Sequence, residues 1–131
     1  MIAVLDASAA IEIALGATNA EIFGKYLHDA DIVIAPNVYP SEICNVFWKY
    51  ATFSDLDAVK AQKGIDFCID LVDEYVDTAP MWREVFAESV KYRHPVYDLF
   101  YLVLARRQNA ILLTNDEKMK KLAKDMKIAL P

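Results

Sequence analysis

Short apolar runs alternate with longer segments of helical period along this chain. Residues 2–5, 32–35 and 111–113 are continuous apolar runs that are too short for helices. Strands that are apolar on both faces occur in parallel sheets whose two faces are covered by helices. The alternation therefore predicts an α/β fold, a three-layer α/β/α sandwich around a central, mostly parallel sheet.

Helical periodicity fills the segments between these strands. Helices are expected over residues 8–15, 21–29, 41–52, 54–70, 80–93, 96–107 and 117–126. Ser8 is the expected N-cap of the first helix, while Ser54 and Asp57 have the spacing of a capping box at the start of the fourth. Residues 75–77 and 127–130 are weaker strand candidates.

The composition is that of a folded globular protein. Apolar residues make up 56% and charged residues 25% of the 131 residues, and no linker, repeat or low-complexity segment divides them. Residues 1–131 are therefore expected to form a single domain. The net charge of -5 argues against a broad electrostatic grip on nucleic acid. It stays compatible with a nucleic-acid substrate handled through cations and a few local basic residues.

The cysteines and the apolar runs bear on the cellular location. Cys44 and Cys68 lie in apolar contexts without the spacing of a metal site, so both are expected to be buried free thiols in a reducing cytoplasm. Asp6 and Glu12 interrupt the apolar N-terminus, which does not resemble a signal peptide. No uncharged apolar stretch approaches the roughly 18–20 residues that cross a bilayer. A cytoplasmic protein with no membrane contact is expected.

Four carboxylates stand beside apolar segments, where an isolated charge is costly. They are Asp6, Glu42, Asp98 and Asp116. A lone ionised carboxylate in apolar surroundings must be neutralised, paired or bound to a metal. Asp6 and Asp116 directly follow strands, at the edge of a parallel sheet where ligands bind. If all four acids converge there, a hard divalent cation is the simplest way to neutralise them.

Each acid taken singly also has a structural explanation. Asp6 and Asp116 are able to cap the helices that follow them. Asp98 begins an apolar helix and could interact with its dipole, a contribution of about 0.3–1 kcal/mol. Glu42 and Asn45 would share one helix face as a polar stripe. The occurrence of four acids in matching contexts favours a common site.

The residue types indicate the chemistry. Carboxylate oxygens favour Mg²⁺, with Mn²⁺ as a substitute, over zinc. His28 and His94 are expected at the surface and not among the ligands. The sequence has no glycine-rich phosphate loop and no order of Ser, His and Asp typical of a covalent nucleophile. The pattern predicts metal-assisted hydrolysis of a phosphate ester, in which one or two cations activate a water.

Seven residues receive roles in this hypothesis. Asp6, Asp98 and Asp116 are the expected direct or water-mediated metal ligands. Glu42 completes the site or positions the attacking water. The side chains expected to orient these carboxylates are Ser8, Asn45 and Thr114.

Four short motifs occur in a familiar order over nearly the whole length. They are Val4-Leu5-Asp6-Ala7-Ser8, Glu42-x-x-Asn45, Asp98-x-x-Tyr101-Leu102-x-Leu104-Ala105 and Leu112-Leu113-Thr114-Asn115-Asp116. With these motifs the chain resembles a PIN domain, and its small size is similar to that of the VapC-type ribonuclease toxins. Asn109 stands where that family often has Gly, and Asn tolerates the left-handed conformation needed there.

The resemblance implies a Mg²⁺-dependent single-strand endoribonuclease with an α/β/α sandwich, commonly a homodimer and the toxin of a toxin–antitoxin pair. It also implies an antitoxin that blocks the acidic pocket, often with a basic side chain. The acidic quartet of the family falls on Asp6, Glu42, Asp98 and Asp116. Its hydroxyl positions fall on Ser8 and Thr114, and its polar helix residue on Asn45.

Two other classes of protein with phosphate chemistry need residues that this sequence lacks. A phosphoacceptor receiver domain needs paired acids after the first strand, and a haloacid-dehalogenase-type phosphatase needs a second Asp two residues after Asp6. Ala7 and Ser8 occupy those places, so both are disfavoured. A non-catalytic PIN-like binding scaffold and a housekeeping RNA-processing nuclease stay open as alternatives.

Three further groups of residues have two interpretations each. The lysines near the C-terminus form either a solvated helix face or a contact for an RNA backbone; they are Lys118, Lys120, Lys121, Lys124 and Lys127. Arg93 and His94 either belong to a loop or reach a substrate phosphate. One aromatic group either packs in the core or forms a surface for a partner; it comprises Phe47, Trp48, Tyr50 and Phe53.

Overall fold

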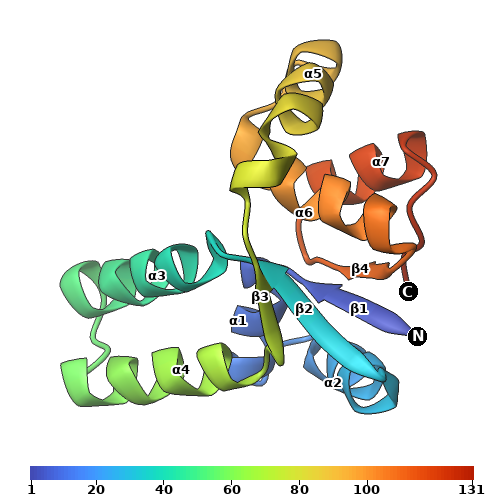
Figure 1. Cartoon of the computed structure of the whole chain (residues 1–131). Coiled ribbons are helices and arrows are strands. Elements are labelled where there is room, and N and C mark those ends of the chain that lie inside the picture. The colour runs from blue at the N-terminus through green and yellow to red at the C-terminus, as the bar shows by residue number, and fades with distance from the viewer.

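The computed structural model describes residues 1–131 (Figure 1). Its elements are, in order, β1 (Ile2–Leu5), α1 (Ala7–Leu15), α2 (Ala20–Asp29), β2 (Ile32–Pro36), α3 (Tyr39–Phe53), α4 (Ala58–Asp70), β3 (Glu74–Val76), the 3-10 turn η1 (Ala79–Met81), α5 (Trp82–Tyr92), α6 (Val96–Gln108), β4 (Ile111–Leu113) and α7 (Glu117–Asp125). The three apolar runs form β1, β2 and β4, as predicted from the sequence.

The four strands form one parallel sheet in the order β3-β2-β1-β4. The central strand β1 pairs with β2 on one side and with β4 on the other, so that Ala3 lies opposite both Val33 and Ile111. The chain moves outward from β1 to β3 and then returns across the sheet to β4. Strand order therefore reverses between β1 and β4, and in open α/β sheets ligands bind at such a reversal.

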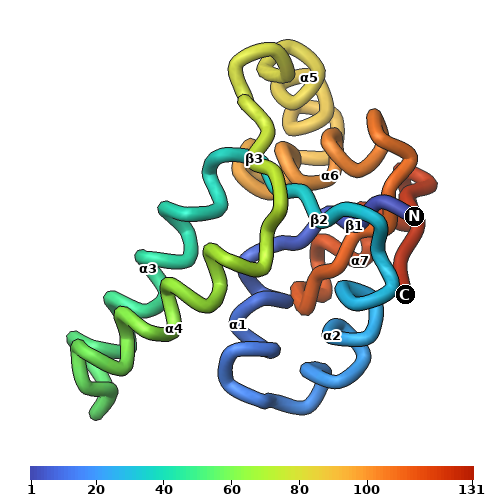
Figure 2. Tube along the Cα trace, turned by 60° about the horizontal axis from the view of Figure 1, so that its bottom comes forward, coloured from blue at the N-terminus to red at the C-terminus, as the bar shows by residue number.

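Helices cover both faces of the sheet. On one face α6 contacts β1, β2 and β4, and α5 and α7 pack against α6. On the other face lie α1 and α2, and α4 contacts α1 (Figure 2). The predicted three-layer α/β/α sandwich is confirmed. The helices α3 and α4 pack against each other and extend to one side of the sheet as a hairpin (Figure 1).

The part of the core that positions the site is built around α6, β1 and β4, and α6 contacts both strands. Residues 101–105 are almost completely buried, as expected for a helix with so long an apolar run. Leu5 of β1 and Leu112 of β4 are fully buried in the same core cluster. Burying one aliphatic side chain of this size contributes about 1.5–3 kcal/mol. This packing holds the carboxyl ends of β1 and β4 in place relative to α6.

The predicted cap of the first helix is wrong by two residues. Helix α1 begins directly after β1, so Asp6 is its N-cap and accepts a hydrogen bond from the backbone N–H of Ala9. Ser8 lies within the first turn instead. Both residue types are good N-caps. Because β1 ends at Leu5 and α1 begins at Ala7, Asp6 is the only residue between them and takes the N-cap position.

Other local predictions also need correction. Ser54 ends α3 and does not open α4, and Asp57 precedes α4 without making a capping hydrogen bond. Residues 127–130 form only an isolated bridge, between Ile111 and Ala129, and not a strand. The predicted helix over 80–93 is divided, because Pro80 lies in the turn η1 before α5 begins.

Cysteine and aromatic side chains differ in exposure along the hairpin. Cys44 on α3 is exposed, against the prediction, whereas Cys68 on α4 is buried, and both are free thiols. Phe47 is buried, but Trp48 and Phe53 are exposed and pack edge to face with ring centroids 5.6 Å apart. The aromatic group is therefore partly core and partly surface.

No helix in the structure has both the length and the apolar character needed to span a bilayer.

Candidate active site

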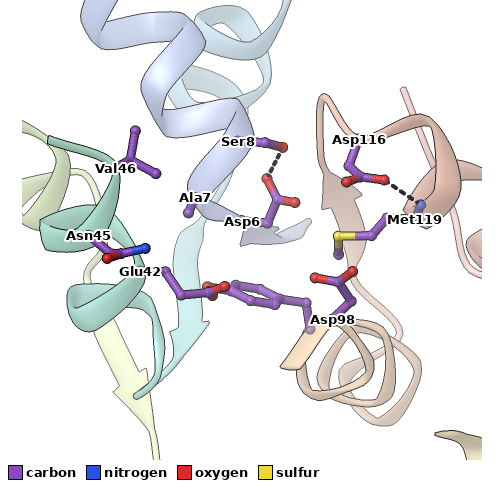
Figure 3. A pocket seen from close by; sticks show the side chains of 10 residues that line it. Asp6, Ala7, Ser8, Glu42, Asn45, Val46, Asp98, Asp116 and Met119 are labelled. Carbon is purple, nitrogen blue, oxygen red and sulfur yellow. Dashed lines mark hydrogen bonds between the residues drawn. The ribbon is translucent and has the colours of Figure 1, made fainter. Parts of the chain in front are cut away.

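The four acids selected from the sequence line one pocket at the carboxyl edge of the sheet (Figure 3). Asp6 follows β1 and Asp116 follows β4, at the point where strand order reverses. Glu42 and Asp98 come from the first turns of α3 and α6. The pocket has a volume of about 250 Å³, and its other lining residues are Ala7, Ser8, Asn45, Val46, Tyr101 and Met119. No lysine or arginine lines it.

Asp6 is almost completely buried, at 3% exposure. Its Oδ1 accepts hydrogen bonds from the backbone N–H of Ala9 at 2.9 Å and from the Ser8 hydroxyl at 2.7 Å. Its Oδ2 accepts one from the Thr114 hydroxyl at 2.6 Å. Burial raises the pKa of Asp6 to about 6; the hydrogen bonds oppose this rise and the charge of Asp98 adds to it. A desolvated carboxylate beside a second acid favours a cationic ligand.

Asp116 caps α7 through one oxygen and leaves the other without a partner in the protein. Its Oδ1 accepts a hydrogen bond from the backbone N–H of Met119 at 3.0 Å, and its Oδ2 accepts none. The capping explanation weighed for Asp6 and Asp116 is thus correct for both, and both also line the pocket. Because capping occupies one oxygen of Asp116, the other stays available to a ligand.

Two hydroxyl groups connect the ends of β1 and β4. Thr114 is 1% exposed, and its hydroxyl accepts a hydrogen bond from the backbone N–H of Asp116 at 3.1 Å while donating to Asp6. The Ser8 hydroxyl donates to Asp6 and accepts a hydrogen bond from the backbone N–H of Asn115 at 2.8 Å. Since each hydroxyl both donates and accepts, the two together fix the Asp6 carboxylate and the loop after β4.

Glu42 is held by a tyrosine of another helix. The Tyr101 hydroxyl donates to Glu42 Oε1 at 2.5 Å, and Glu42 Oε2 has no hydrogen-bond partner in the protein. Burial raises the pKa of Glu42 above its ordinary value; the hydrogen bond from Tyr101 opposes this rise, and the charge of Asp98 adds to it. Burial and the neighbouring Glu42 carboxylate also raise the pKa of Tyr101 far above its ordinary value, so the phenol is a permanent donor.

Asp98 pairs with a histidine that was predicted to lie at the surface. His94 Nε2 lies 2.6 Å from Asp98 Oδ2, and the His94 side chain is only 15% exposed, so the surface prediction for His94 is wrong. His28, by contrast, is 88% exposed, as predicted. Asp98 Oδ1 has no hydrogen-bond partner in the protein. Asp98 therefore also presents one held oxygen and one free oxygen.

The remaining predicted residues are less closely tied to the carboxylates. Asn45 lines the pocket, but it is exposed and donates no hydrogen bond to any of the four acids, contrary to the orienting role expected for it. Arg93 is exposed and ends α5 in the left-handed conformation, as does Asn109 at the end of α6. The C-terminal lysines lie outside the pocket; Lys120 and Lys124 line a separate hollow beside Thr114.

The donor set suits a hard cation in chemistry and charge. Three acids, Glu42, Asp98 and Asp116, each keep one oxygen free of protein hydrogen bonds, and no basic side chain except His94 pairs with any pocket acid. Oxygen-only donors favour Mg²⁺ or Mn²⁺. No three acidic side chains are close enough together to bind one ion directly as they stand. Joint binding therefore requires side-chain rotation or intervening water.

The PIN domain family matches residues 3–125, which is nearly the whole sequence. The chain belongs to the PIN domain family. PIN domains are generally metal-dependent nucleases, so the family supports a nuclease function for this acidic pocket. No curated protein shows a significant match.

Two solved structures have a similar fold. The structure of PAE2754 from Pyrobaculum aerophilum is similar with a TM-score of 0.73 and 20% sequence identity, over 91% of this PIN domain and 82% of that chain. A chain in the structure of VapBC2 from Rickettsia felis bound to a DNA fragment from their promoter has a TM-score of 0.68 and 16% sequence identity. The match covers 100% of this PIN domain and 98% of that chain. At these identities the likeness shows the fold.

Sequence reasoning missed two residues that contact acids of the PIN-domain pocket. Tyr101 was noted only as part of a motif, although its position three residues after Asp98 places both on one face of α6. His94 lies four residues before Asp98, but it precedes the first turn of α6, so the helical spacing did not indicate the contact. The contact of Tyr101 with Glu42 depends on how α6 and α3 lie relative to each other, and that of His94 with Asp98 depends on the turn before α6.

Proposed function

We propose that this PIN-domain protein is a Mg²⁺-dependent endoribonuclease, with Mn²⁺ able to substitute, that hydrolyses phosphodiester bonds in RNA. One observation carries the proposal: four carboxylates line a single pocket without lysine or arginine, and three of them present a free oxygen. Such a pocket repels an RNA phosphate unless cations neutralise it. A divalent cation would supply charge neutralisation, activate water and stabilise the departing oxygen.

The proposed roles follow from the contacts of each acid. Asp6, Asp98 and Asp116 would hold the cation, with Asp6 fixed by Ser8 and Thr114. The free Oε2 of Glu42 would accept a proton from the attacking water or hold that water in line. Burial raises the pKa of the Glu42 carboxyl group above its ordinary value, and so closer to neutral pH. This direction suits a general base. Asn45, exposed at the rim, would contact the substrate or the water around the cation.

We further propose that the protein is the toxin of a toxin–antitoxin pair. Its small size and motif order resemble VapC-type toxins, and one structural neighbour is named VapBC2. An antitoxin would block the pocket with a basic side chain, which the four acids would attract. A homodimer in the cytoplasm is proposed from the same resemblance, and the two free thiols suit a reducing compartment.

A non-catalytic scaffold is the main alternative, followed by a housekeeping RNA-processing nuclease. A scaffold has no need of a buried acid whose pKa is raised to about 6, because such an acid destabilises the folded state at neutral pH. The acid at Asp6 therefore favours catalysis over scaffolding. An adjacent gene for a small DNA-binding antitoxin would favour the toxin over the housekeeping enzyme.

The proposal is tested by RNA cleavage with purified protein freed of any antitoxin. Cleavage is expected with Mg²⁺ or Mn²⁺ and not with EDTA, and Asp98→Asn should abolish it. Asp66→Asn is the matched control, because Asp66 is an exposed acid on α4 outside the pocket. Equal cleavage by Asp98→Asn and the parent protein would contradict the role of Asp98. Cleavage that persists in EDTA would contradict metal dependence.

A further inference from the structure

Glu42 has a single anchor at the pocket. The Tyr101 hydroxyl reaches it from α6, across to α3, and the two residues are 59 positions apart in the sequence. A glutamate has more rotatable bonds than an aspartate, so it loses more conformational freedom when it is fixed in one place. Asp6 accepts three hydrogen bonds, whereas Glu42 accepts one. The position of Glu42 therefore depends on one phenol.

Tyr101 lines the pocket, but its side chain is almost completely buried, at 1% exposure. Its hydroxyl is already engaged with Glu42. Tyr101 lies one helical turn after Asp98, so a single face of α6 provides one acid and the donor that holds another. Asp98 and Glu42 line the same pocket, so their ionised side chains repel each other. Without the phenol, this repulsion would favour rotation of Glu42 away from Asp98.

A second buried tyrosine, Tyr39, has a hydroxyl whose contact is purely structural. Tyr39 is fully buried, and its hydroxyl donates to the backbone carbonyl of Cys68 at 2.6 Å. That bond links α3 to α4 and lies outside the acidic pocket. Tyr101 differs in that its acceptor is a pocket carboxylate. Phenylalanine would fill nearly the same space at either position, so each hydroxyl can be removed separately from its ring.

We infer that Tyr101 is a positioning residue of this site, whose hydroxyl holds Glu42 so that Oε2 stays directed to the reacting water. The inference rests on the proposed nuclease function. Tyr101 acts through Glu42 and touches neither the RNA nor the cation. Loss of its hydroxyl should therefore lower the rate of the chemical step and leave RNA binding unchanged.

The test compares Tyr101→Phe with the matched control Tyr39→Phe. Loss of a residue that orients a metal-site carboxylate typically costs about 10–100-fold in activity. We expect Tyr101→Phe to lower kcat by this factor with an unchanged KM for RNA, and Tyr39→Phe to retain the parental kcat. Equal kcat values for the two variants would overturn the inference. Absence of Mg²⁺-dependent cleavage by the parent protein would instead overturn the proposed nuclease.

A stability cycle tests the same contact without any activity. In EDTA, Tyr101→Phe should lower the Tm of the parent protein but not the Tm of Glu42→Ala, because in that variant the hydroxyl has already lost its acceptor. An equal loss of Tm in both backgrounds would assign Tyr101 to packing and overturn the inference. If Tyr101→Phe alone does not fold, the double variant decides: it should fold as well as Glu42→Ala, and failure to do so would also overturn the inference.

Discussion

The hydroxyl of Thr114 donates to Oδ2 of Asp6 at 2.6 Å, although the two residues are 108 positions apart in the sequence. Both are almost fully buried, at 1% and 3% exposure. The bond joins the residue that follows β1 to the residue that follows β4, beside the backbone pairing of these strands. It therefore contributes to the fold and to the orientation of a pocket acid at once.

Thr114→Val should reduce stability and activity together. Valine has nearly the same shape but lacks the hydroxyl, so it leaves Asp6 Oδ2 buried without a donor and removes the acceptor for the backbone N–H of Asp116. Loss of one partner of a buried hydrogen bond costs about 1–3 kcal/mol. Urea unfolding in EDTA should show a loss of this size. Thr52→Val, at an exposed position on α3, is the control and should change little.

The Asp6 carboxyl predicts a specific pH dependence of stability. Its pKa is raised from 3.8 to about 6 in the folded protein, so the folded state binds this proton more tightly than the unfolded state. Stability from this group is complete below about pH 4 and is lost as the pH rises through 6. The difference corresponds to roughly 3 kcal/mol at pH 7.

Asp6→Asn should remove this dependence, because the amide does not ionise. In EDTA, the variant should be more stable than the parent protein at pH 7, and the advantage should shrink between pH 6 and pH 4. Urea unfolding across this range measures the difference, in which contributions of other acids cancel. Parallel stability profiles for the two proteins would contradict the raised pKa of Asp6.

Asp116→Asn separates capping from cation binding. Asparagine caps helices about as well as aspartate, so its side-chain oxygen should still accept from the backbone N–H of Met119 and the Tm in EDTA should be preserved. Mn²⁺ at 100 times its Kd should stabilise the parent protein by about 2.7 kcal/mol. The variant should gain clearly less in the same thermal titration. An undiminished gain would exclude Asp116 from the cation site.

Two glycines should respond oppositely to replacement by alanine. A Cβ at Gly64 of α4 would lie 2.5 Å from the buried ring of Phe47, so Gly64→Ala should overpack the hairpin and cost about 1–3 kcal/mol. A Cβ at Gly24 of α2 would meet nothing within 4 Å. Gly24→Ala should therefore stabilise the protein by about 0.5–1 kcal/mol through helix propensity. Thermal unfolding of the two variants checks both signs.

The convergence of the acids was predictable where it depended on local sequence. Asp6 and Asp116 follow short apolar strands, and the carboxyl ends of parallel strands share one edge of the sheet. Asp98 lies in the first turn of a helix whose apolar run had to be buried, which fixed that helix against the sheet. These three placements need only strand direction and burial, and both can be read from the order of apolar and polar residues.

The partners of the acids were not predictable in the same way. The contact of Tyr101 with Glu42 depends on the distance between α6 and α3, and no local pattern specifies that distance. Cys44 was expected to be buried because its neighbours are apolar, but α3 projects from the sheet and leaves that side of the helix uncovered. Such contacts are decided by packing between distant segments, which a single sequence does not display.

The pairing of β1 with β4 has a consequence for synthesis in the cell. The first strand of the chain leaves the ribosome long before its neighbour β4, so during translation Asp6 has no Thr114 to hold it and Asp116 does not yet exist. The nascent protein is thus without a complete set of acids until Asp116, the last of the four along the chain, has been made. Any activity that needs all four acids therefore cannot begin before β4 has been made and has paired with β1.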